Sequence, residues 1–443
     1  MSGPSAGESS PSLRRTLGTT DLTLLVVGNV IGSGIFIVPS AVLREAGSVP
    51  MAMAVWVVGG VLSLFGALSY AELGAMDRGS GGLYSYVRDA FGRFPAFLLG
   101  WTFFFGIGGG TVAALAVAIT SYLGQFVVLA PVAQKGIAVA LIAAMAAIAF
   151  PGIRRSATVQ NWGTLVKFVA LLVMSVILLA GGQGGAPLPA ADHAGPGALL
   201  SAAGVAMLSV LWAYEGWQYV TFATGEAADP ARSMPRAIGL GTLLIIGIYL
   251  LANVGYLAAL GPAGVAASER VAGDAMTAVL GPWAGRAIAA AIIVSMWSAA
   301  LATVITLPRA SYTMARDGAF FAALAKVHPT HQTPAVAIVA TCAWAAALAL
   351  SGTFEQLLAY VVFVGWIFYA LAAAAVIVLR RKRPDAERPY RVPGYPVTPL
   401  LFVLAAVALV ANTIVTQPRF AALGLGMVAL GAPAYLVWRR GDR

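Results

Sequence analysis

The sequence of 443 residues is 60% hydrophobic and only 10% charged, whereas an ordinary soluble domain carries about 25% charged residues. With a mean hydropathy of +0.86, this composition excludes an ordinary soluble domain and indicates an all-α integral membrane protein. The formal net charge of +10 is compatible with a nucleic-acid partner or with basic loops on one side of a membrane. The positions of the basic residues along the chain distinguish these two explanations.

Membrane-spanning segments fill most of the chain. A bilayer core about 30 Å thick requires about 20 apolar residues per helix, and this criterion predicts about twelve spans with short connections. The predicted spans are residues 21–43, 51–76, 95–124, 134–151, 159–181, 197–224, 236–260, 276–306, 334–352, 355–380, 398–415 and 419–439. Residues 1–13 are expected to form a disordered tail without the order of a signal peptide, so the first span is retained.

Lysine and arginine residues are distributed unevenly over the loops. With a cytoplasmic N-terminus, only Arg44, Lys135, Arg270, Arg286 and Arg419 fall on the outward side, while Lys167 falls inside a span. All the other basic residues fall on the inward side, as expected for a multi-pass protein of the inner (plasma) membrane. We therefore expect both termini to be cytoplasmic and the basic excess to reflect topology, with no nucleic-acid partner.

The first span contains the segment GNVIGSGIFIVPS, residues 28–40, in which glycines, a serine and Pro39 interrupt an apolar run. Glycine in a spanning helix is commonly a device for close helix packing, and for this segment alone that alternative stays open. A break in the helix would instead expose unpaired backbone groups, which are tolerated at this depth only around a cavity.

The sixth span contains a second interrupted segment, LWAYEGWQYVTFATGEAADP, residues 211–230. It carries Gly216, Gly225 and an acidic residue, Glu215, at mid-membrane depth. Interrupted spans at corresponding places in two halves of a chain are typical of inverted-repeat transporters. The pairing favours a transporter with a substrate site between two broken helices.

Broken helices present free N–H groups and a positive dipole end on one half and free carbonyls on the other, which suits a zwitterion such as an amino acid. The amides of Ser33, Gly34 and Ile35 are expected to bind an α-carboxylate, and glycine at 32 and 34 allows close approach. Carbonyls of the other half, helped by the sixth span, are expected to bind the α-ammonium. The expected substrate-binding residues are Val30, Ile31, Gly32, Ser33, Gly34, Ile35, Trp212, Ala213 and Glu215.

Two ionisable residues lie inside predicted spans, where they are costly and therefore indicate function. Lys167 is a candidate coupling residue, although its long stem could also carry the ammonium group towards the cytoplasmic face. Glu215 could carry a proton, attract the substrate ammonium or favour a cationic substrate. It could also face water or accept bonds from helix-end amides, and these alternatives stay open.

Other acidic residues lie close to predicted cytoplasmic ends of spans. We expect Glu72, Glu226, Asp89 and Asp229 to pair with arginines there rather than to act chemically. The glycine run GIGGG, residues 106–110, is expected to pack against span one or eight or to form part of the cavity wall.

The sequence contains no phosphate-binding loop, and His193, His328 and His331 lack metal-ligand spacing, so no cofactor or metal is expected. The single cysteine, Cys342, falls inside a span, so no disulfide-linked heavy-chain partner is expected. An enzyme would need a convergent catalytic set, and a channel would need a continuous polar pore. A transporter-like amino-acid sensor remains as an alternative.

Four motifs occur in order along the chain: GNVIGSGIF, RGSGGLYSYVRDAFG, AYEGW with EAADPARSMPRAI, and RPDAERPYRVPGYP. With them the chain, over about residues 14–440, resembles the amino acid, polyamine and organocation superfamily. It looks most like the L-type amino-acid transporter family, including its bacterial members.

The resemblance implies the leucine-transporter fold, with helices one and six broken. The first inverted repeat would span residues 14–182, the second 197–383, and two further helices 397–440. It also implies that the amides of Ser33 and Gly34 hold the carboxylate, that Gly32 permits the turn, and that Trp212 forms an aromatic lid. Lys167 would replace the sodium ion of sodium-coupled relatives. Many relatives have a small residue at the position of Glu215, so their substrate range does not transfer directly.

These expectations combine into one function. The protein would move L-amino acids, preferably neutral ones, across the membrane by alternating access, as a sodium-independent exchanger or a proton-linked permease. An alternative is a transporter of cationic amino acids or polyamines, with Glu215 as the counter-charge. Its partners would be the amino-acid substrate and the lipid bilayer.

Overall fold

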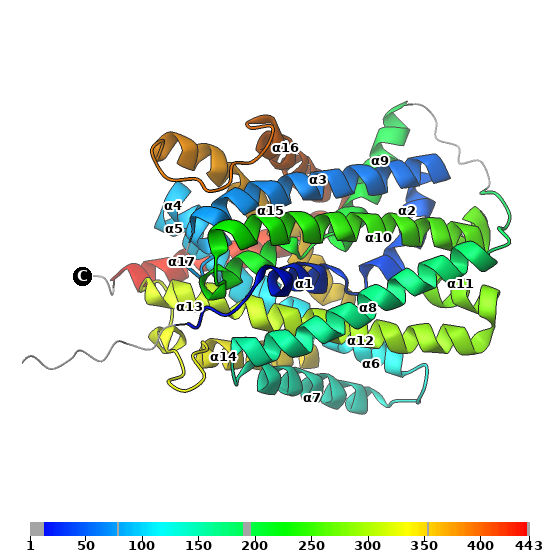
Figure 1. Ribbon diagram of the computed structural model, residues 1–443, viewed down its shortest axis with the longest axis horizontal. Coiled ribbons are helices and arrows are strands. Elements are labelled where there is room, and N and C mark those ends of the chain that lie inside the picture. The colour runs from blue at the N-terminus through cyan, green and yellow to red at the C-terminus, as the bar shows by residue number, and fades with distance from the viewer. Residues whose placement is uncertain (1–12, 78, 189–195, 352–353, 441–443) are drawn as a thin grey trace, which may run out of the picture.

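The computed structural model describes residues 13–77, 79–188, 196–351 and 354–440, and these residues form a bundle of helices (Figure 1). The β-type pairing among them is one isolated bridge, between Leu17 and Ala227. The first-half elements are α1 (Thr19–Val30), α2 (Gly34–Ala46), α3 (Val49–Met76), α4 (Leu83–Phe91), α5 (Arg93–Thr102), the π-helix η1 (Phe103–Gly108), α6 (Gly109–Leu123), α7 (Pro131–Ala149) and α8 (Ile153–Gly181). The second-half elements are α9 (Pro196–Ala213), the 3-10 helix η2 (Trp217–Glu226), α10 (Pro230–Ala267), α11 (Val271–Leu280), α12 (Pro282–Thr306), α13 (Pro308–Arg316), η3 (Ala322–Ala325), α14 (Ala335–Ser351), α15 (Phe354–Lys382), α16 (Val397–Thr416) and α17 (Pro418–Arg440).

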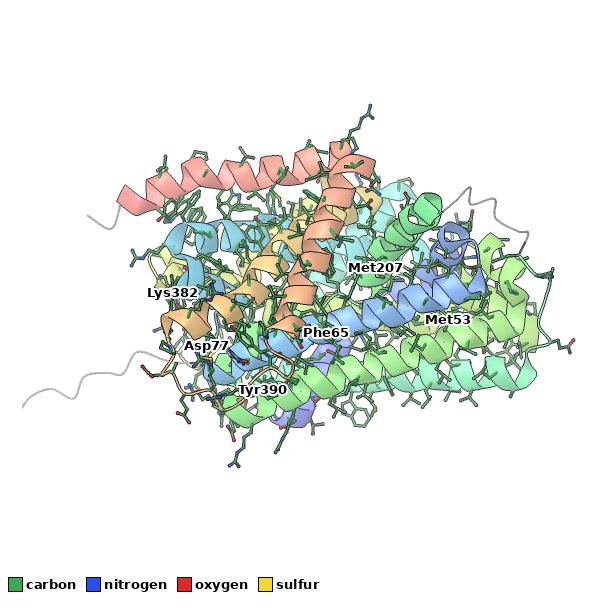
Figure 2. All side chains as sticks on the ribbon, turned by 90° about the horizontal axis from the view of Figure 1, so that it is seen from above. Met53, Phe65, Asp77, Met207, Lys382 and Tyr390 are labelled. Atoms are coloured by element: carbon green, nitrogen blue, oxygen red, sulfur yellow. The ribbon has the colours of Figure 1, made fainter. Side chains whose placement is uncertain are left out.

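Most of the long helices run along the long axis of the molecule, and the described chain begins and ends at the same end of the bundle (Figure 1). We call this end the terminal end and the opposite one, where α11 lies, the distal end. Figure 2 shows Asp77, Lys382 and Tyr390 together at the terminal end and Met53 towards the distal end.

The described residues include 9 helices that are long and apolar enough to cross a membrane, or up to 10 if a bent pair is one span. An all-helical membrane protein is thereby confirmed. Every predicted span overlaps between one and three of the observed helical elements, while the number of about twelve crossings stays a prediction.

The first predicted span is broken. Helices α1 and α2 meet at an angle of 48° across residues 31–33. Within α2, Pro39 has no N–H to donate to the carbonyl of Ile35, one turn earlier. The hydroxyl of Tyr256 on α10 lies 3.3 Å from that oxygen and donates to it instead, so a neighbouring helix satisfies the group that proline leaves free.

The sixth predicted span also changes conformation part way. Helix α9 ends at Ala213, and the chain continues through a turn into the 3-10 helix η2. Gly216 forms the turn with φ of 127°, a backbone conformation that favours glycine. Its amide donates to Oε1 of Gln218 at 3.1 Å, so the interruption has its own local hydrogen bond.

The third span contains the π-helix η1, which includes the first three residues of the GIGGG run. A Cβ on Gly106 would meet Met427 of α17, and one on Gly109 would meet Trp344 of α14. The expected packing against span one or eight is therefore wrong for these two glycines, which α17 and α14 cover. A Cβ on Gly108 would lie 3.4 Å from Leu307 at the end of α12, the predicted span eight, so the expectation holds for this glycine. Nε1 of Trp344 donates to the carbonyl of Phe105 at 2.8 Å, which satisfies a backbone group inside the π-helix.

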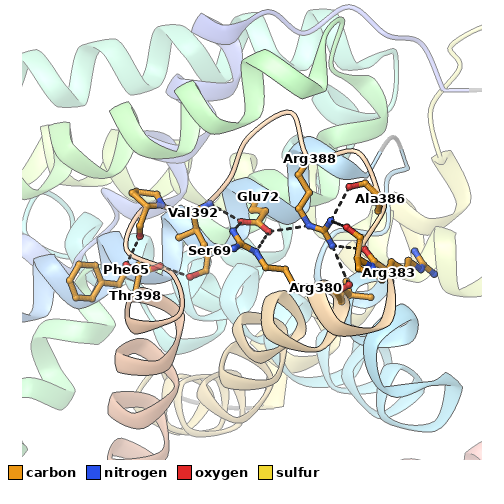
Figure 3. Close-up of polar contacts among 12 residues, drawn as sticks. Phe65, Ser69, Glu72, Arg380, Arg383, Ala386, Arg388, Val392 and Thr398 are labelled. Atoms are coloured by element: carbon orange, nitrogen blue, oxygen red, sulfur yellow. Dashed lines mark hydrogen bonds and ion pairs between the residues drawn. The ribbon is translucent and has the colours of Figure 1, made fainter.

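Glu72 near the end of α3 fastens the loop of residues 383–396 to the terminal end (Figure 3). Its carboxylate accepts bonds from Nε and Nη2 of Arg380 at 2.9 and 2.6 Å. It also accepts a bond from the amide of Val392 at 2.7 Å, and Nε of Arg388 lies 3.6 Å from Oε1. One buried carboxylate thus joins α3, α15 and the loop that follows α15.

A second buried ion pair joins the end of η2 to α13. Nε and Nη2 of Arg309 donate to the two oxygens of Glu226 at 2.9 and 3.2 Å, and both side chains are almost fully buried. The amides of Thr16 and Leu17 donate to the backbone carbonyl of Glu226, so the N-terminal segment is fastened at the same place.

The predicted arginine pairing of the acidic residues is confirmed. In addition to Glu72 and Glu226, Asp89 pairs with Arg88 and Arg383. The carboxylate of Asp229 lies 3.9 Å from Nε of Arg232. These carboxylates hold helices and loops together at their ends.

Candidate functional site

The two interruptions lie against each other in the middle of the bundle. A Cβ on Gly34 would lie 2.9 Å from Cα of Ala213, and one on Gly216 would lie 2.7 Å from the carbonyl oxygen of Asn29. Both glycines are therefore required by the close approach of one interrupted span to the other. This contact brings the start of α2 next to the end of α9.

A cavity of about 70 Å³ lies at this junction. Its walls come from both interrupted spans and from α6 and α12, and include Ser33, Trp212, Glu215, Leu115 and Thr303. Pockets that hold drug-sized ligands have volumes of about 300–1,000 Å³. The cavity is smaller than such pockets, so a ligand of several heavy atoms requires the surrounding helices to move apart.

The start of α2 offers free hydrogen-bond donors beside this cavity. Among the described residues, the backbone amides of Ser33, Gly34 and Ile35 have no acceptor, as expected for the first turn of a helix. The positive end of the α2 dipole lies at the same point. The arrangement is suited to an anionic group such as a carboxylate.

The end of α1 has the opposite character, but its carbonyls are already engaged. Nζ of Lys167 on α8 donates to the carbonyls of Gly28 and Ile31 at 2.7 and 2.6 Å. Oγ of Ser295 on α12 lies 3.1 Å from the carbonyl oxygen of Ile31. Tyr249 Oη donates to the carbonyl of Val30 at 3.2 Å. These side chains replace the amide donors that a continuous helix would have supplied.

Glu215 lies at the other side of the cavity and is held by two tyrosines. Oε1 accepts bonds from Oη of Tyr369 at 2.6 Å and from Oη of Tyr219 at 2.9 Å. Oε2 is buried and has no hydrogen-bond partner among the described residues. A buried carboxylate oxygen without a partner is rare and costly, and it indicates a place for a donor that binds here.

The structure brings most of the predicted site residues together. The cavity is lined by Val30, Gly32, Ser33, Gly34, Trp212, Ala213 and Glu215. Ile31, Ile35 and Lys167 are not part of this lining. Lys167 is buried, with an exposed fraction of only 2%, and its ammonium group bonds to the backbone of the break rather than reaching the membrane surface.

Several residues of the site were not predicted. Ser295, Ala299 and Thr303 follow one another at helical spacing on α12, and this stripe of small residues was a detectable signal of a face turned towards a cavity. Tyr369 lies in an apolar run of α15 whose pattern gives no indication of its contact with Glu215. Among the described residues, no group of three or more metal-ligating side chains could hold a metal ion.

Comparison with known proteins agrees with this geometry. Residues 17–430 match the model of the amino acid permease family. The serine/threonine exchanger SteT of Bacillus subtilis (strain 168) is 30% identical over 96% of this chain and 96% of its own length. The large neutral amino acids transporter small subunit 2 of Homo sapiens is 31% identical over 98% of this chain and 82% of its own. The human b(0,+)-type amino acid transporter 1 is 33% identical over 92% and 84%. The chain belongs to the amino acid permease family, within the amino acid, polyamine and organocation superfamily.

Proposed function

We propose that this protein moves neutral L-amino acids across the membrane by alternating access, as a sodium-independent exchanger or a proton-linked permease. It is a transporter and not an enzyme. The observation that carries the proposal is the pair of interrupted spans in contact, with unpaired amides on α2 and an unpaired carboxylate oxygen on Glu215 at one cavity. Relatives along nearly the whole chain carry the names of amino-acid exchangers and transporters, which supports the same function.

In this proposal the substrate carboxylate binds the amides of Ser33, Gly34 and Ile35. The carbonyl of Ile31 already accepts bonds from Lys167 and Ser295, and that of Val30 from Tyr249 and the amide of Gly32. A carbonyl oxygen has only two lone pairs. The α-ammonium is therefore directed towards Oε2 of Glu215, and Trp212 covers the bound molecule as a lid.

Lys167 is proposed to stand in place of a coupling cation. Its Nζ binds two carbonyls at the end of α1 and lies 3.5 Å from the carbonyl oxygen of Ser295 on α12. An ammonium group at this point supplies a positive charge to the α1 carbonyls and links α1 to α8. Transport should then proceed without sodium.

The architecture is proposed to be that of the leucine-transporter fold, with inverted repeats over residues 14–182 and 197–383 and further helices over 397–440. The terminal end carries the buried ion pairs and most basic residues and is proposed to face the cytoplasm, as the uneven loop charge favours. The membrane is the inner (plasma) membrane. Cys342 is buried in α14, and no disulfide-linked partner is proposed.

A second candidate function rests on Glu215. Its unpaired oxygen could also bind the side-chain cation of a basic amino acid or a polyamine, because a buried carboxylate favours a charged partner. L-lysine and putrescine therefore belong in any substrate test. Preferential transport of these compounds would show that the substrates are cationic rather than neutral amino acids.

The proposal is tested with purified protein in proteoliposomes, each batch loaded with one unlabelled amino acid. Uptake of a labelled amino acid is measured with and without a pH gradient, in sodium buffer and in choline buffer. We expect counterflow with small or apolar neutral amino acids, at the same rate in both buffers. If no amino acid inside or outside supports uptake, the proposed function is wrong, and binding without uptake would indicate a sensor.

A further inference from the structure

A second and larger cavity lies towards the distal end of the bundle. Its volume is about 290 Å³, close to the lower limit of about 300 Å³ for small-molecule pockets. Its walls come from α2, α6, α11 and α12 and include Phe36, Tyr122, Arg270, Asp274 and Arg286. We call it the distal pocket.

The distal pocket and the central cavity share three walls. Helix α6 lines the central cavity with Leu115 and the distal pocket with Tyr122. Helix α12 lines the central cavity with Ala299 and the distal pocket with Ile292. On each helix the two positions are about two turns apart, or roughly 10 Å at 1.5 Å per residue. Phe36 of α2 lines the distal pocket just beyond the amides of the central site. The two cavities thus lie one above the other along the same helices.

Two arginines line the distal pocket, and their surroundings differ from those of Arg44 and Lys135. Arg270 and Arg286 are both exposed, and neither guanidinium pairs with a carboxylate in the described part of the chain. By contrast, the guanidinium of Arg44 and the ammonium of Lys135, which also lie at this end, donate to backbone carbonyls at 2.7 Å. Two unpaired cations therefore gather at one cavity.

One acidic side chain completes the set. Asp274 accepts a bond from Oγ of Ser268 at 2.6 Å through Oδ2. The same Ser268 hydroxyl oxygen accepts a bond from the amide of Arg270 at 3.1 Å. These bonds fix the start of α11 and keep Arg270 and Asp274 at the same wall. The lining thus combines two guanidinium groups with one carboxylate, a net positive charge.

We propose that the distal pocket is a second binding site for amino acids, which captures them on their way to the central site. Arg270 and Arg286 bind the α-carboxylate, a charge-assisted contact in which guanidinium matches carboxylate geometry. Asp274 binds the α-ammonium. The inference rests on the proposed transport function and deepens it, because the net positive charge of the pocket selects neutral or anionic amino acids and repels cationic ones.

The test compares the double variant Arg270→Gln/Arg286→Gln with wild type and with Arg419→Gln, which removes an exposed arginine of α17 outside both cavities. Uptake of labelled L-serine is measured as a function of concentration in proteoliposomes loaded with unlabelled L-serine. If L-serine is not carried, the neutral amino acid carried fastest in the counterflow panel takes its place. We expect the double variant to raise KM about tenfold, equivalent to about 1.4 kcal/mol, with the maximal rate within about twofold of wild type. Arg419→Gln should leave both values unchanged.

Two further readouts separate capture from damage to the fold. The KM of wild type should rise with ionic strength between about 0.01 and 0.3 M, because salt screens exposed charges, and the KM of the double variant should not. Inhibition of uptake by L-lysine should become stronger in the double variant, since the repelling charges are gone. An unchanged KM in the double variant, or a wild-type KM independent of salt, overturns the distal site and leaves the transport function standing. Absence of all uptake by wild type overturns the function itself.

Discussion

At the scale of single residues, the glycines of the first span have different tasks. A Cβ on Gly34 would lie 2.9 Å from Cα and 3.1 Å from Cβ of Ala213, so this glycine permits contact between the interrupted spans. A Cβ on Gly32 would meet only Ala299 and Leu115, at 3.7 and 3.9 Å. Gly32 therefore keeps space free in the cavity instead of permitting helix contact.

This difference predicts different effects of two small substitutions. Gly32→Ala should keep the melting temperature of wild type but weaken substrate binding at least tenfold, because its methyl group fills part of a cavity of about 70 Å³. Gly34→Ala should lower stability by about 1–3 kcal/mol through overpacking. Melting curves and binding titrations in detergent measure both quantities. A Gly32→Ala protein that binds like wild type would contradict the position of the site.

Lys167 carries the second prediction at this scale. Lys167→Ala should abolish transport and lower the melting temperature, because the carbonyls of Gly28 and Ile31 lose a donor. The unsatisfied carbonyl of Gly28 costs about 1–3 kcal/mol, whereas the carbonyl of Ile31 keeps its bond from Ser295. Lys135→Ala is the matched control, since that lysine also donates to a carbonyl but is exposed. Normal transport by Lys167→Ala would rule out the coupling role.

The sequence predicted the break, but not what surrounds it. Gly32, Gly34 and Pro39 predicted an interrupted helix once they were paired with the second interrupted segment in the sixth span, and the 48° bend between α1 and α2 agrees with that prediction. Lys167 was selected because a charged residue inside a span is costly. It contacts the break, while its coupling role stays a prediction. That Lys167 and Ser295 satisfy the Ile31 carbonyl depends on how α8 and α12 pack on α1. Such contacts between distant segments leave no periodic pattern in the sequence.

At the scale of elements, buried ion pairs connect helices and loops at the terminal end of the bundle. The pair of Glu226 and Arg309 links η2, which follows the second interruption, to α13. Glu72 links α3 to α15 and to the following loop. The sequence predicted arginine partners for these carboxylates. It could not predict which arginines, because Arg309 lies 83 positions from Glu226 and Arg380 lies 308 positions from Glu72.

Removing one partner of the buried pair should be costly. Glu226→Gln leaves the guanidinium of Arg309 buried and without its counter-charge, a change that typically costs about 3–5 kcal/mol. The double variant Glu226→Gln/Arg309→Met should recover part of this loss. Asp229→Asn serves as the control because its pair with Arg232 is exposed and 3.9 Å long, so we expect at most about 1 kcal/mol. Equal melting temperatures for Glu226→Gln and Asp229→Asn would contradict this account.

At the scale of the whole molecule, every predicted span overlaps helical structure in the described residues, because apolar length marks where a chain can cross a bilayer. Of these helices 9, or up to 10 if the bent pair is one span, are long and apolar enough to cross. The local type of helix within each span was less predictable than the position of the span. The π-helix in the third span and the 3-10 helix after α9 arise from contacts with neighbours that local propensity does not reveal.

The proposed orientation predicts which loops face outward. In a Cys342→Ala background, Val128→Cys introduces a thiol at a distal position where the native side chain is 98% exposed. Asp385→Cys introduces one in the loop after α15, at the terminal end. A membrane-impermeant maleimide should label the first variant and not the second in intact spheroplasts. The reverse pattern would show that the terminal end faces outward.

The central claim is that unpaired amides of α2 bind the carboxylate of an amino acid between the two interrupted spans. The most direct measurement compares binding of the amino acid carried fastest with binding of its carboxamide and its methyl ester, which keep the ammonium and side chain but lack the negative charge. We predict that both analogues bind at least about 100-fold more weakly, a difference of about 2.8 kcal/mol. Binding of the carboxamide and the ester as tightly as the free acid would contradict the account.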